Sequence, residues 1–175
     1  MTILKVNIPV IETERLRLRE PRESDLPAVI SFMGSERSRF VGGPVAEHHA
    51  FRSYAASLGH WMLRGYGFWM VADLATDAPL GRVGFLYGTG WHEPELGWQM
   101  FEGAEGKGMA YEAAKAARAY GRAKLGLDGV ISYLNPANTR SMALAKRLGC
   151  THERDVTFFG EEGIGIWRHP KGGTS

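Results

Sequence analysis

The segment from residue 94 to residue 120, PELGWQMFEGAEGKGMAYEAAKAARAY, joins a short apolar run, a glycine-punctuated turn and an alanine-rich stretch. This pattern predicts a strand, a turn at Gly103, Gly106 and Gly108, and a helix over residues 107–124. A glycine turn that opens a helix presents unpaired backbone N–H groups at the positive end of the helix dipole. The segment is therefore a candidate site for phosphate or pyrophosphate, although a plain strand–turn–helix connection produces the same pattern.

Two common phosphate-binding motifs fit this segment poorly. A P-loop requires Lys followed by Ser or Thr after its last glycine, whereas Met109 and Ala110 follow Gly108. A dinucleotide-binding turn requires a small residue at position 111, which is Tyr, and an acidic residue at the end of the next strand. Asp128 lies at about the right distance but precedes that strand. Neither motif explains the segment.

The composition is that of an ordinary soluble globular protein, with 44% hydrophobic and 23% charged residues among 175. We expect a single domain over residues 1–175, with a loose tail at 171–175. The net charge of +2 does not require nucleic acid. The single cysteine excludes an internal disulfide and a cysteine-based zinc site, so a cytoplasmic protein without a metal is expected. No signal-peptide pattern and no membrane-length apolar run, which needs about 20 residues, are found.

Hydrophobic periodicity predicts the elements that precede the segment. Residues 11–19 alternate around Leu16 and Leu18, which indicates a half-buried strand with Arg15, Arg17 and Arg19 on its solvated face. Ser24 is a plausible N-cap for a helix that ends by Gly34. A second helix is expected over residues 47–63, and residues 67–74 and 80–87 are expected to form a hairpin. The apolar stripe expected on the second helix consists of Phe51, Tyr54, Ala55, Leu58 and Met62.

The remaining elements complete an α/β fold. Strands are expected over residues 95–101 and 130–134, and the second must run parallel to the first because a helix lies between them. A helix over residues 139–148 and two strands over 151–159 and 164–168 follow. The order β-α-α-β-β-β-α-β-α-β-β predicts a mixed sheet with helices on both faces.

Several motifs in this order resemble those of the GNAT superfamily of acetyltransferases, and most closely those of the Rim-type branch, the ribosomal-protein N-terminal acetyltransferases. The acyl-coenzyme A loop of that superfamily has the pattern Gln/Arg-x-x-Gly-x-Gly/Ala, and this chain departs from it at Glu105. Cys150 stands where the branch usually has Phe. The resemblance covers nearly the whole chain from Thr13 onward. It is carried by Gly97-Trp98, Glu105-Gly106-Lys107-Gly108-Met109-Ala110, Glu112-Ala113, Asn138-Thr139-Arg140-Ser141 and Arg147-Leu148-Gly149.

The resemblance implies a mostly antiparallel sheet of about six to seven strands, with acetyl-CoA bound between a splayed central pair and no metal. Asn138 would bind the pantetheine arm or its adjoining phosphate, although a helix cap after Pro136 also explains it. Met100 and Glu102 would offer backbone groups to the pantetheine arm. The diphosphate would be held by the backbone of Glu105, Gly106, Lys107, Gly108, Met109 and Ala110. Candidates for phosphate contacts, or simply surface charges, are Lys107, Arg140, Lys146 and Arg147.

The expected chemistry requires a base, because only a neutral amine can attack the thioester. An alkylamine with a pKa of about 10.4 is almost wholly protonated at pH 7. Glu95 is the first candidate, since the resemblance places a base glutamate nearby; an exposed strand residue is the alternative. Glu93 and His92 are the next candidates. A backbone N–H near Met100 would stabilise the oxyanion.

The proton donor for the leaving thiolate is less defined. Many GNAT enzymes use a tyrosine at a position that is occupied here by Ala145. The resemblance to the Rim-type branch implies Ser141 in this role, with Tyr133 and Tyr111 as possible substitutes.

These observations lead to an acetyl-CoA-dependent N-acetyltransferase that modifies a primary amine, on a protein N-terminus or a small molecule, by direct attack on the thioester. The alternative is a non-catalytic acyl-CoA sensor or interaction module, suggested by Ala145 and Glu105. RNA binding through Arg15, Arg17 and Arg19 is a more remote alternative, and no membrane partner is expected. The sequence does not identify the acceptor, and it does not decide between a monomer and a homodimer.

Overall fold

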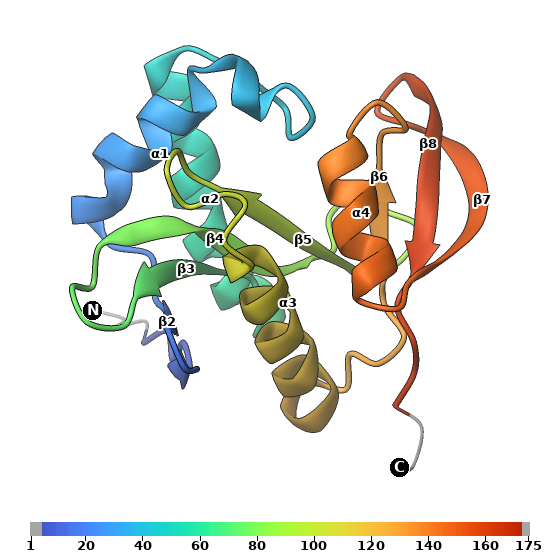
Figure 1. Cartoon of the computed structure of the whole chain (residues 1–175). Coiled ribbons are helices and arrows are strands. Elements are labelled where there is room, and N and C mark those ends of the chain that lie inside the picture. The colour runs from blue at the N-terminus through green and yellow to red at the C-terminus, as the bar shows by residue number, and fades with distance from the viewer. Residues whose placement is uncertain (1–4, 173–175) are drawn as a thin grey trace.

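The computed structural model describes residues 5–172, which form an eight-stranded sheet in the order β1-β2-β3-β4-β5-β6-β8-β7 (Figure 1). Only β5 and β6 are parallel neighbours; the other pairs are antiparallel. The predicted mixed, mostly antiparallel sheet and its parallel return are confirmed. The strands are β1 Ile11–Glu12, β2 Leu16–Arg19, β3 Phe68–Asp73, β4 Pro79–Leu86, β5 Glu95–Met100, β6 Ile131–Leu134, β7 Thr151–Phe158 and β8 Glu161–Arg168.

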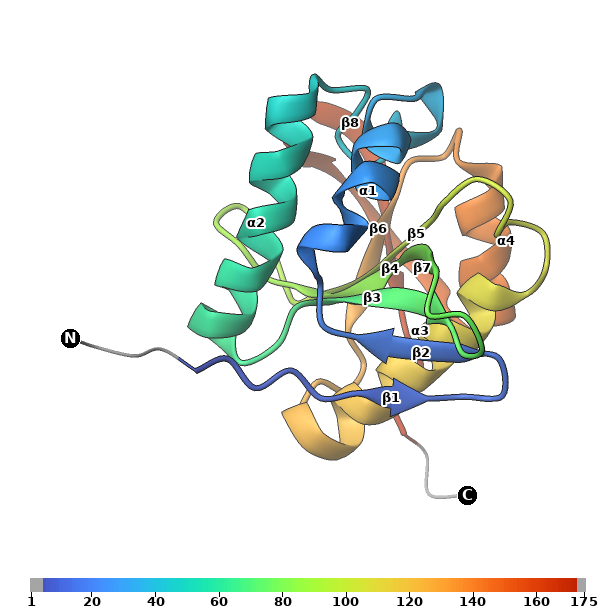
Figure 2. The ribbon, with the colours of Figure 1, turned by 90° about the vertical axis from the view of Figure 1, so that its left-hand side faces the viewer.

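Helices cover both faces of the sheet. Helices α1 (Leu26–Met33) and α2 (Glu47–Arg64) lie on one side of β2–β4, and α3 (Met109–Tyr120) lies on the other (Figure 2). Helix α4 (Thr139–Arg147) packs on the same core as α3. Helix α3 continues into a π-helical turn, η3 (Gly121–Leu125), and two 3-10 turns, η1 (Glu23–Asp25) and η2 (Glu36–Ser38), flank α1.

Two apolar clusters fill the space between the helices and the sheet. The alanines of α3 pack on β2–β4, where their small side chains allow the helix to approach closely. At the end of this helix a Cβ on Gly121 would lie 2.3 Å from the Phe85 ring, so the position requires glycine. On the other face α1 and α2 bury a smaller cluster that includes Phe32, Tyr54 and Phe101.

The predicted strand over residues 11–19 is in fact two strands. The N–H of Thr13 donates to the carbonyl of Leu16 at 2.9 Å, which closes a turn between β1 and β2 and adds one strand to the expected count. The predicted solvated arginine face is wrong for Arg19, whose side chain is 2% exposed. Its guanidinium donates to both carboxylate oxygens of Asp25, each at 2.9 Å, and to Asp77 at 3.1 Å.

The buried face of helix α2 is offset by one residue from the apolar stripe that was expected on it. The side chains of Phe51, Leu58 and Met62 are exposed. The face that packs on the sheet consists of Ala50, Tyr54, Ser57 and Trp61. Both sets have helical spacing, so periodicity could not choose between them. Ser24 lies inside η1, and Asp25 holds the N-cap position of α1, which corrects the predicted cap.

The buried pair of Arg19 and Asp25 gives the first prediction. Burial alone would raise the pKa of Asp25, but its bonds to Arg19, Arg22 and Tyr54 outweigh burial and lower it. We expect Asp25→Asn to lower the free energy of unfolding by about 3 kcal/mol, because it leaves the buried Arg19 charge with only the partly exposed Asp77 as an acidic partner. Urea denaturation at pH 7 measures this change.

The half-exposed Arg17, replaced by Ala, is the control and should cost less than about 1 kcal/mol. Because the folded-state pKa of Asp25 is depressed, its contribution is present above the unfolded pKa and is lost as the pH falls through the folded value. Equal losses of unfolding free energy in the two variants at pH 7 would contradict the stabilising role of the buried Arg19–Asp25 pair.

Candidate functional site

Strands β5 and β6 separate almost as soon as they meet. They are paired at Glu95 and Ile131, whereas β4 pairs with β5 along its whole length. Just beyond that point the Ser132 hydroxyl donates to the carbonyl of Leu96 at 2.5 Å. Within the described residues, the edge of β5 from Gly97 to Met100 that faces β6 has no strand partner (Figure 1). This is the splayed pair that the resemblance implied.

A buried histidine braces the point of separation. Nε2 of His169 lies 3.0 Å from the Ser132 hydroxyl, whose proton is donated to Leu96, so Nε2 carries the donated proton. Nδ1 then accepts, with Arg118 at 3.4 Å and Cys150 at 3.2 Å. Burial, and then the Arg118 charge, lower the pKa of His169 to about 3, so it is neutral. Burial raises the pKa of Cys150 to about 11, which makes this thiol inert at neutral pH.

The glycine turn predicted before α3 is present in the structure. Gly103, Gly106 and Gly108 all have left-handed φ values, +80°, +72° and +78°. No side chain caps the helix at Gly108. Among the described residues, no hydrogen-bond acceptor is found for the backbone N–H groups of Gly106, Gly108, Met109 and Ala110. These donors lie at the positive end of α3, where an oxyanion is stabilised.

A cleft of about 1000 Å³ borders these N–H groups and runs past α4 to the segment that follows α1. Both Trp98 and Gln99 line it, although neighbouring residues of a strand point to opposite faces of the sheet. The cleft therefore crosses the sheet between β5 and β6. The predicted residues that line it are Met100, Glu105, Gly106, Gly108, Met109, Ala110, Asn138, Ser141, Arg140 and Arg147.

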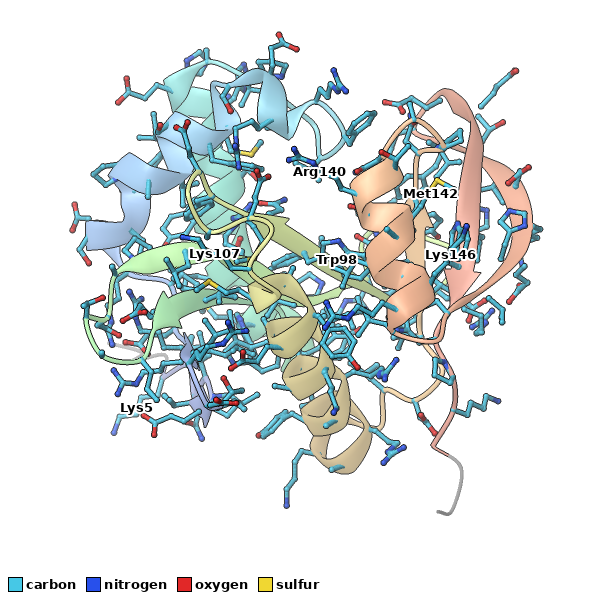
Figure 3. All side chains as sticks on the ribbon, in the orientation of Figure 1. Lys5, Trp98, Lys107, Arg140, Met142 and Lys146 are labelled. Atoms are coloured by element: carbon cyan, nitrogen blue, oxygen red, sulfur yellow. The ribbon has the colours of Figure 1, made fainter. Side chains whose placement is uncertain are left out.

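Four predicted residues, Glu95, Glu102, Lys107 and Lys146, are not among those lining the cleft. Lys107 instead borders a second cavity, of about 530 Å³, beside α3, and its carbonyl accepts a hydrogen bond from Arg15 at 3.0 Å. Figure 3 shows Trp98 between α3 and α4, with Arg140 projecting from α4 toward the loop. Arg140 and Arg147 are therefore better placed than the two lysines to meet a ligand in the cleft.

Asn138 and Ser141 form the rim of the cleft at α4. The Asn138 side-chain oxygen accepts from the N–H of Ser141 at 3.2 Å, which is the helix cap considered as an alternative. No hydrogen bond of its side-chain nitrogen is found within residues 5–172, so this donor is available to a ligand. The Ser141 hydroxyl accepts from the Trp98 indole N–H at 3.2 Å and keeps its own proton for donation.

Glu105 joins three elements across the mouth of the cleft. Its carboxylate lies 2.7 Å from Arg37 of η2 and 3.0 Å from Arg140 of α4. The departure from the family motif therefore neutralises two arginines that line the cleft. Sequence reasoning missed Arg37, because it lies in an unpatterned segment and only the fold brings it to the loop.

Glu95 lies at the closed end of the gap, on the same strand face as Gln99. Burial raises the pKa of Glu95 to about 7, which the nearby Trp91 indole and the Tyr133 backbone N–H offset only in part. Glu93 differs: its hydrogen bonds with Arg168, at 2.5 and 2.8 Å, lower its pKa. Of the two carboxyls, Glu95 has the pKa suited to proton transfer near pH 7.

The remaining candidates are held by other contacts. Nδ1 of His92 lies 3.0 Å from the Tyr133 hydroxyl, and the Tyr133 ring stacks on Phe158 with 3.9 Å between centroids. Tyr111 lines the cleft, and the guanidinium of Arg147 lies 4.2 Å from its ring centre.

The described part of the chain shows no group of three His, Cys, Asp or Glu side chains arranged as metal ligands. It also shows no helix with the length and apolarity needed to cross a membrane.

Comparison with known proteins assigns the domain. The sequence profile described as "Acetyltransferase (GNAT) domain" matches residues 15–151. The chain belongs to the GNAT acetyltransferase family. An acetyltransferase from Agrobacterium tumefaciens strain C58 is 34% identical to this chain, with a TM-score of 0.88 over 98% of this chain and 99% of that one. The GNAT domain found here is thus an N-acetyltransferase domain.

Two further proteins are similar over a shorter stretch or at lower identity. The uncharacterized N-acetyltransferase YnaD of Bacillus subtilis strain 168 is 32% identical over 77 residues. This match covers 44% of this chain and 45% of that relative, so it spans less than half of its length. A spermidine N-acetyltransferase from Vibrio cholerae, solved with CoA and spermine, is 18% identical, with a TM-score of 0.71 over 89% of this chain and 94% of that one. This last likeness shows the fold alone. GNAT acetyltransferases take their acetyl group from acetyl-CoA.

The pairing of Glu105 gives a prediction for binding of the donor. Glu105→Gln restores the residue type of the family motif and releases Arg37 and Arg140 toward the ligand phosphates. We expect the affinity for coenzyme A to rise roughly two- to fivefold, as for one exposed charge pair, and to depend more steeply on salt. Isothermal titration at two salt concentrations measures both effects. Weaker binding by this variant would show instead that the ion pairs are needed to hold the loop in place.

Proposed function

We propose that the protein transfers the acetyl group of acetyl-CoA to a primary amine by direct attack of the amine on the thioester. The observation that carries this proposal is the row of unpaired N–H groups at the start of α3, which borders a cleft that crosses the sheet. Such a cleft lets the donor enter from the α3 and α4 side and the amine from the α1 and α2 side. The resemblance to the Rim-type branch supports a protein N-terminus as the acceptor, beside small-molecule amines.

The cleft fits the parts of coenzyme A in order. The N–H groups of Gly106 to Ala110 suit its diphosphate, and Arg140 and Arg147 add positive charge beside them. The free edge of β5, with backbone groups of Met100 and Glu102, suits the amides of the pantetheine arm. The Asn138 side-chain N–H groups can donate to the same arm. Acetyl-CoA supplies an acetyl group that is already activated as a thioester.

Glu95 and Ser141 take the two proton-transfer roles. With a pKa of about 7, Glu95 is partly ionised at neutral pH and can accept a proton from the incoming ammonium, directly or through water. A backbone N–H of β5 near Met100 stabilises the oxyanion. The Ser141 hydroxyl, held by the Trp98 indole, donates to the departing thiolate.

A non-catalytic acyl-CoA sensor is the second candidate, because Ala145 replaces the family's tyrosine and Glu105 neutralises two cleft arginines. Thioester consumption with a panel of primary amines separates the two. Binding of acetyl-CoA without turnover of any amine would favour the sensor.

The diphosphate site predicts the effect of Gly108→Val. Its φ of +78° strains any β-branched residue, so valine there should move the loop N–H groups out of the arrangement that the proposed phosphate site requires. We expect acetyl-CoA affinity to fall by about 100-fold or more in isothermal titration, as for the loss of a charge-assisted set of hydrogen bonds. Gly126→Val is the matched control, since Gly126 has a φ of +68° and does not line the cleft. If both variants bind as the unmodified protein does, the loop is not the phosphate site.

The base assignment predicts a change in pH dependence. In the unmodified enzyme, kcat/KM should rise with pH through about 7, because Glu95 acts only as a carboxylate. Glu95→Gln should leave acetyl-CoA binding intact, lower turnover at pH 7 by about 100-fold and remove that inflection. Glu93→Gln, which disturbs only the ion pair with Arg168, should keep it. Identical profiles for Glu95→Gln and the unmodified enzyme would remove Glu95 from the base role.

A further inference from the structure

Arg82 of β4 is a buried cation without an acidic partner. The residue is 5% exposed and lies between β5 and α2. Its Nε and Nη2 donate to the side-chain oxygen of Gln99 at 3.1 and 2.7 Å, and its Nη1 donates to the Ser57 hydroxyl at 3.4 Å. Both partners are neutral, and within the described residues no ion pair of Arg82 is found. Arg19, buried to a similar degree, is held by two aspartates.

This arrangement is costly for a protein that binds nothing there. Removing a guanidinium from water costs several kcal/mol unless a carboxylate and further hydrogen bonds compensate. Burial lowers the pKa of Arg82 to about 10, so it still carries its charge at neutral pH. The rings of Tyr54 and Phe68 lie 5.9 and 5.6 Å from it and offset only part of the cost. The described chain supplies no anion to compensate this charge.

The position of Arg82 links it to the acceptor side of the cleft. Gln99, which accepts from the guanidinium, lines the cleft, whereas Arg82 itself does not. By strand alternation Glu95, Gly97 and Gln99 share one face, and Arg82 is the residue of β4 directly opposite Gln99. The α-carbons of Glu95 and Gln99 are separated by four residues of strand, roughly 13 Å. The proposed base and the buried cation therefore lie along the same side of the gap.

We propose that Arg82 binds a carboxylate of the acceptor, so that the substrates are primary amines bearing a carboxylate several bonds away from the amine. This inference rests on the proposed acetyl transfer. Gln99 accepts two N–H groups from the fork that can hold a carboxylate, and as a flexible side chain on the cleft it can move aside for one. The carboxylate can belong to a free amino acid or to an acidic side chain near a peptide N-terminus.

An acceptor series tests the substrate class. ω-Amino carboxylates from β-alanine to 8-aminooctanoate are compared with n-alkylamines of the same chain length, and the amidated dipeptides Ala-Glu and Ala-Gln form a peptide pair. We expect the best carboxylate-bearing acceptor to exceed its neutral partner by roughly 30-fold or more in kcat/KM, mainly through KM. A preference confined to one of the two sets identifies the source of the carboxylate.

The outcomes of this series separate the two proposals. Equal turnover of every matched pair would overturn the carboxylate inference and leave the acetyltransferase standing. Absence of turnover with all amines, while acetyl-CoA still binds, would overturn both.

Gln99→Glu is the decisive variant, because it supplies Arg82 with an internal carboxylate. We expect its melting temperature to rise and its acetyl-CoA affinity to stay within about twofold. The KM of the carboxylate-bearing acceptor should rise by about 10-fold or more, and the preference over the neutral amine should disappear. Arg82→Lys, which keeps the charge but loses the planar fork, should retain part of the preference. A stabilised Gln99→Glu enzyme with an unchanged preference would show that Arg82 only fastens α2 to the sheet, and the inference would be wrong.

Discussion

The separation of β5 from β6 is the constraint on which the site depends. Backbone groups removed from water must find partners, yet the edge of β5 beyond Leu96 has none from β6, and the first N–H groups of α3 have none either. At the start of the gap the Ser132 hydroxyl donates a hydrogen bond to the Leu96 carbonyl, and the neutral His169 holds Ser132 in place. We propose that coenzyme A, whose phosphate oxygens and amides complement these two sets of unpaired groups, occupies the gap.

The arginines of this protein illustrate how one residue type acquires different roles from its surroundings. Arg19 is neutralised within the fold by Asp25 and Asp77, so it contributes structure. Arg37 and Arg140 share Glu105 at the surface of the cleft, where an exchange of that carboxylate for phosphate costs little. Arg82 has only neutral partners. These differences, rather than the net charge of the chain, indicate where anions bind.

Family and fold define the donor half of the site better than the acceptor half. The proposed donor contacts come largely from backbone groups, which any sequence with the correct turn provides. The proposed acceptor contacts come from side chains, and one fold serves many functions, so the acceptor must be argued from the residues themselves. Glu95 and Arg82 on one face of the sheet form such an argument, because they place the proposed base and a buried cation on the same side of the gap.

The sequence alone determined the strands from β3 to β8, the parallel return of β6 and the glycine turn before α3. These follow from local patterns: alternation, the length of a crossover and the φ values that only glycine adopts freely. Tertiary structure alone decided which face of α2 is buried, the burial of Arg19 and the partners of Glu105, Ser132 and Arg82. Each of these depends on contacts between residues distant in the chain, and two helical faces with the same spacing, or two arginines, are distinguished only by what packs against them.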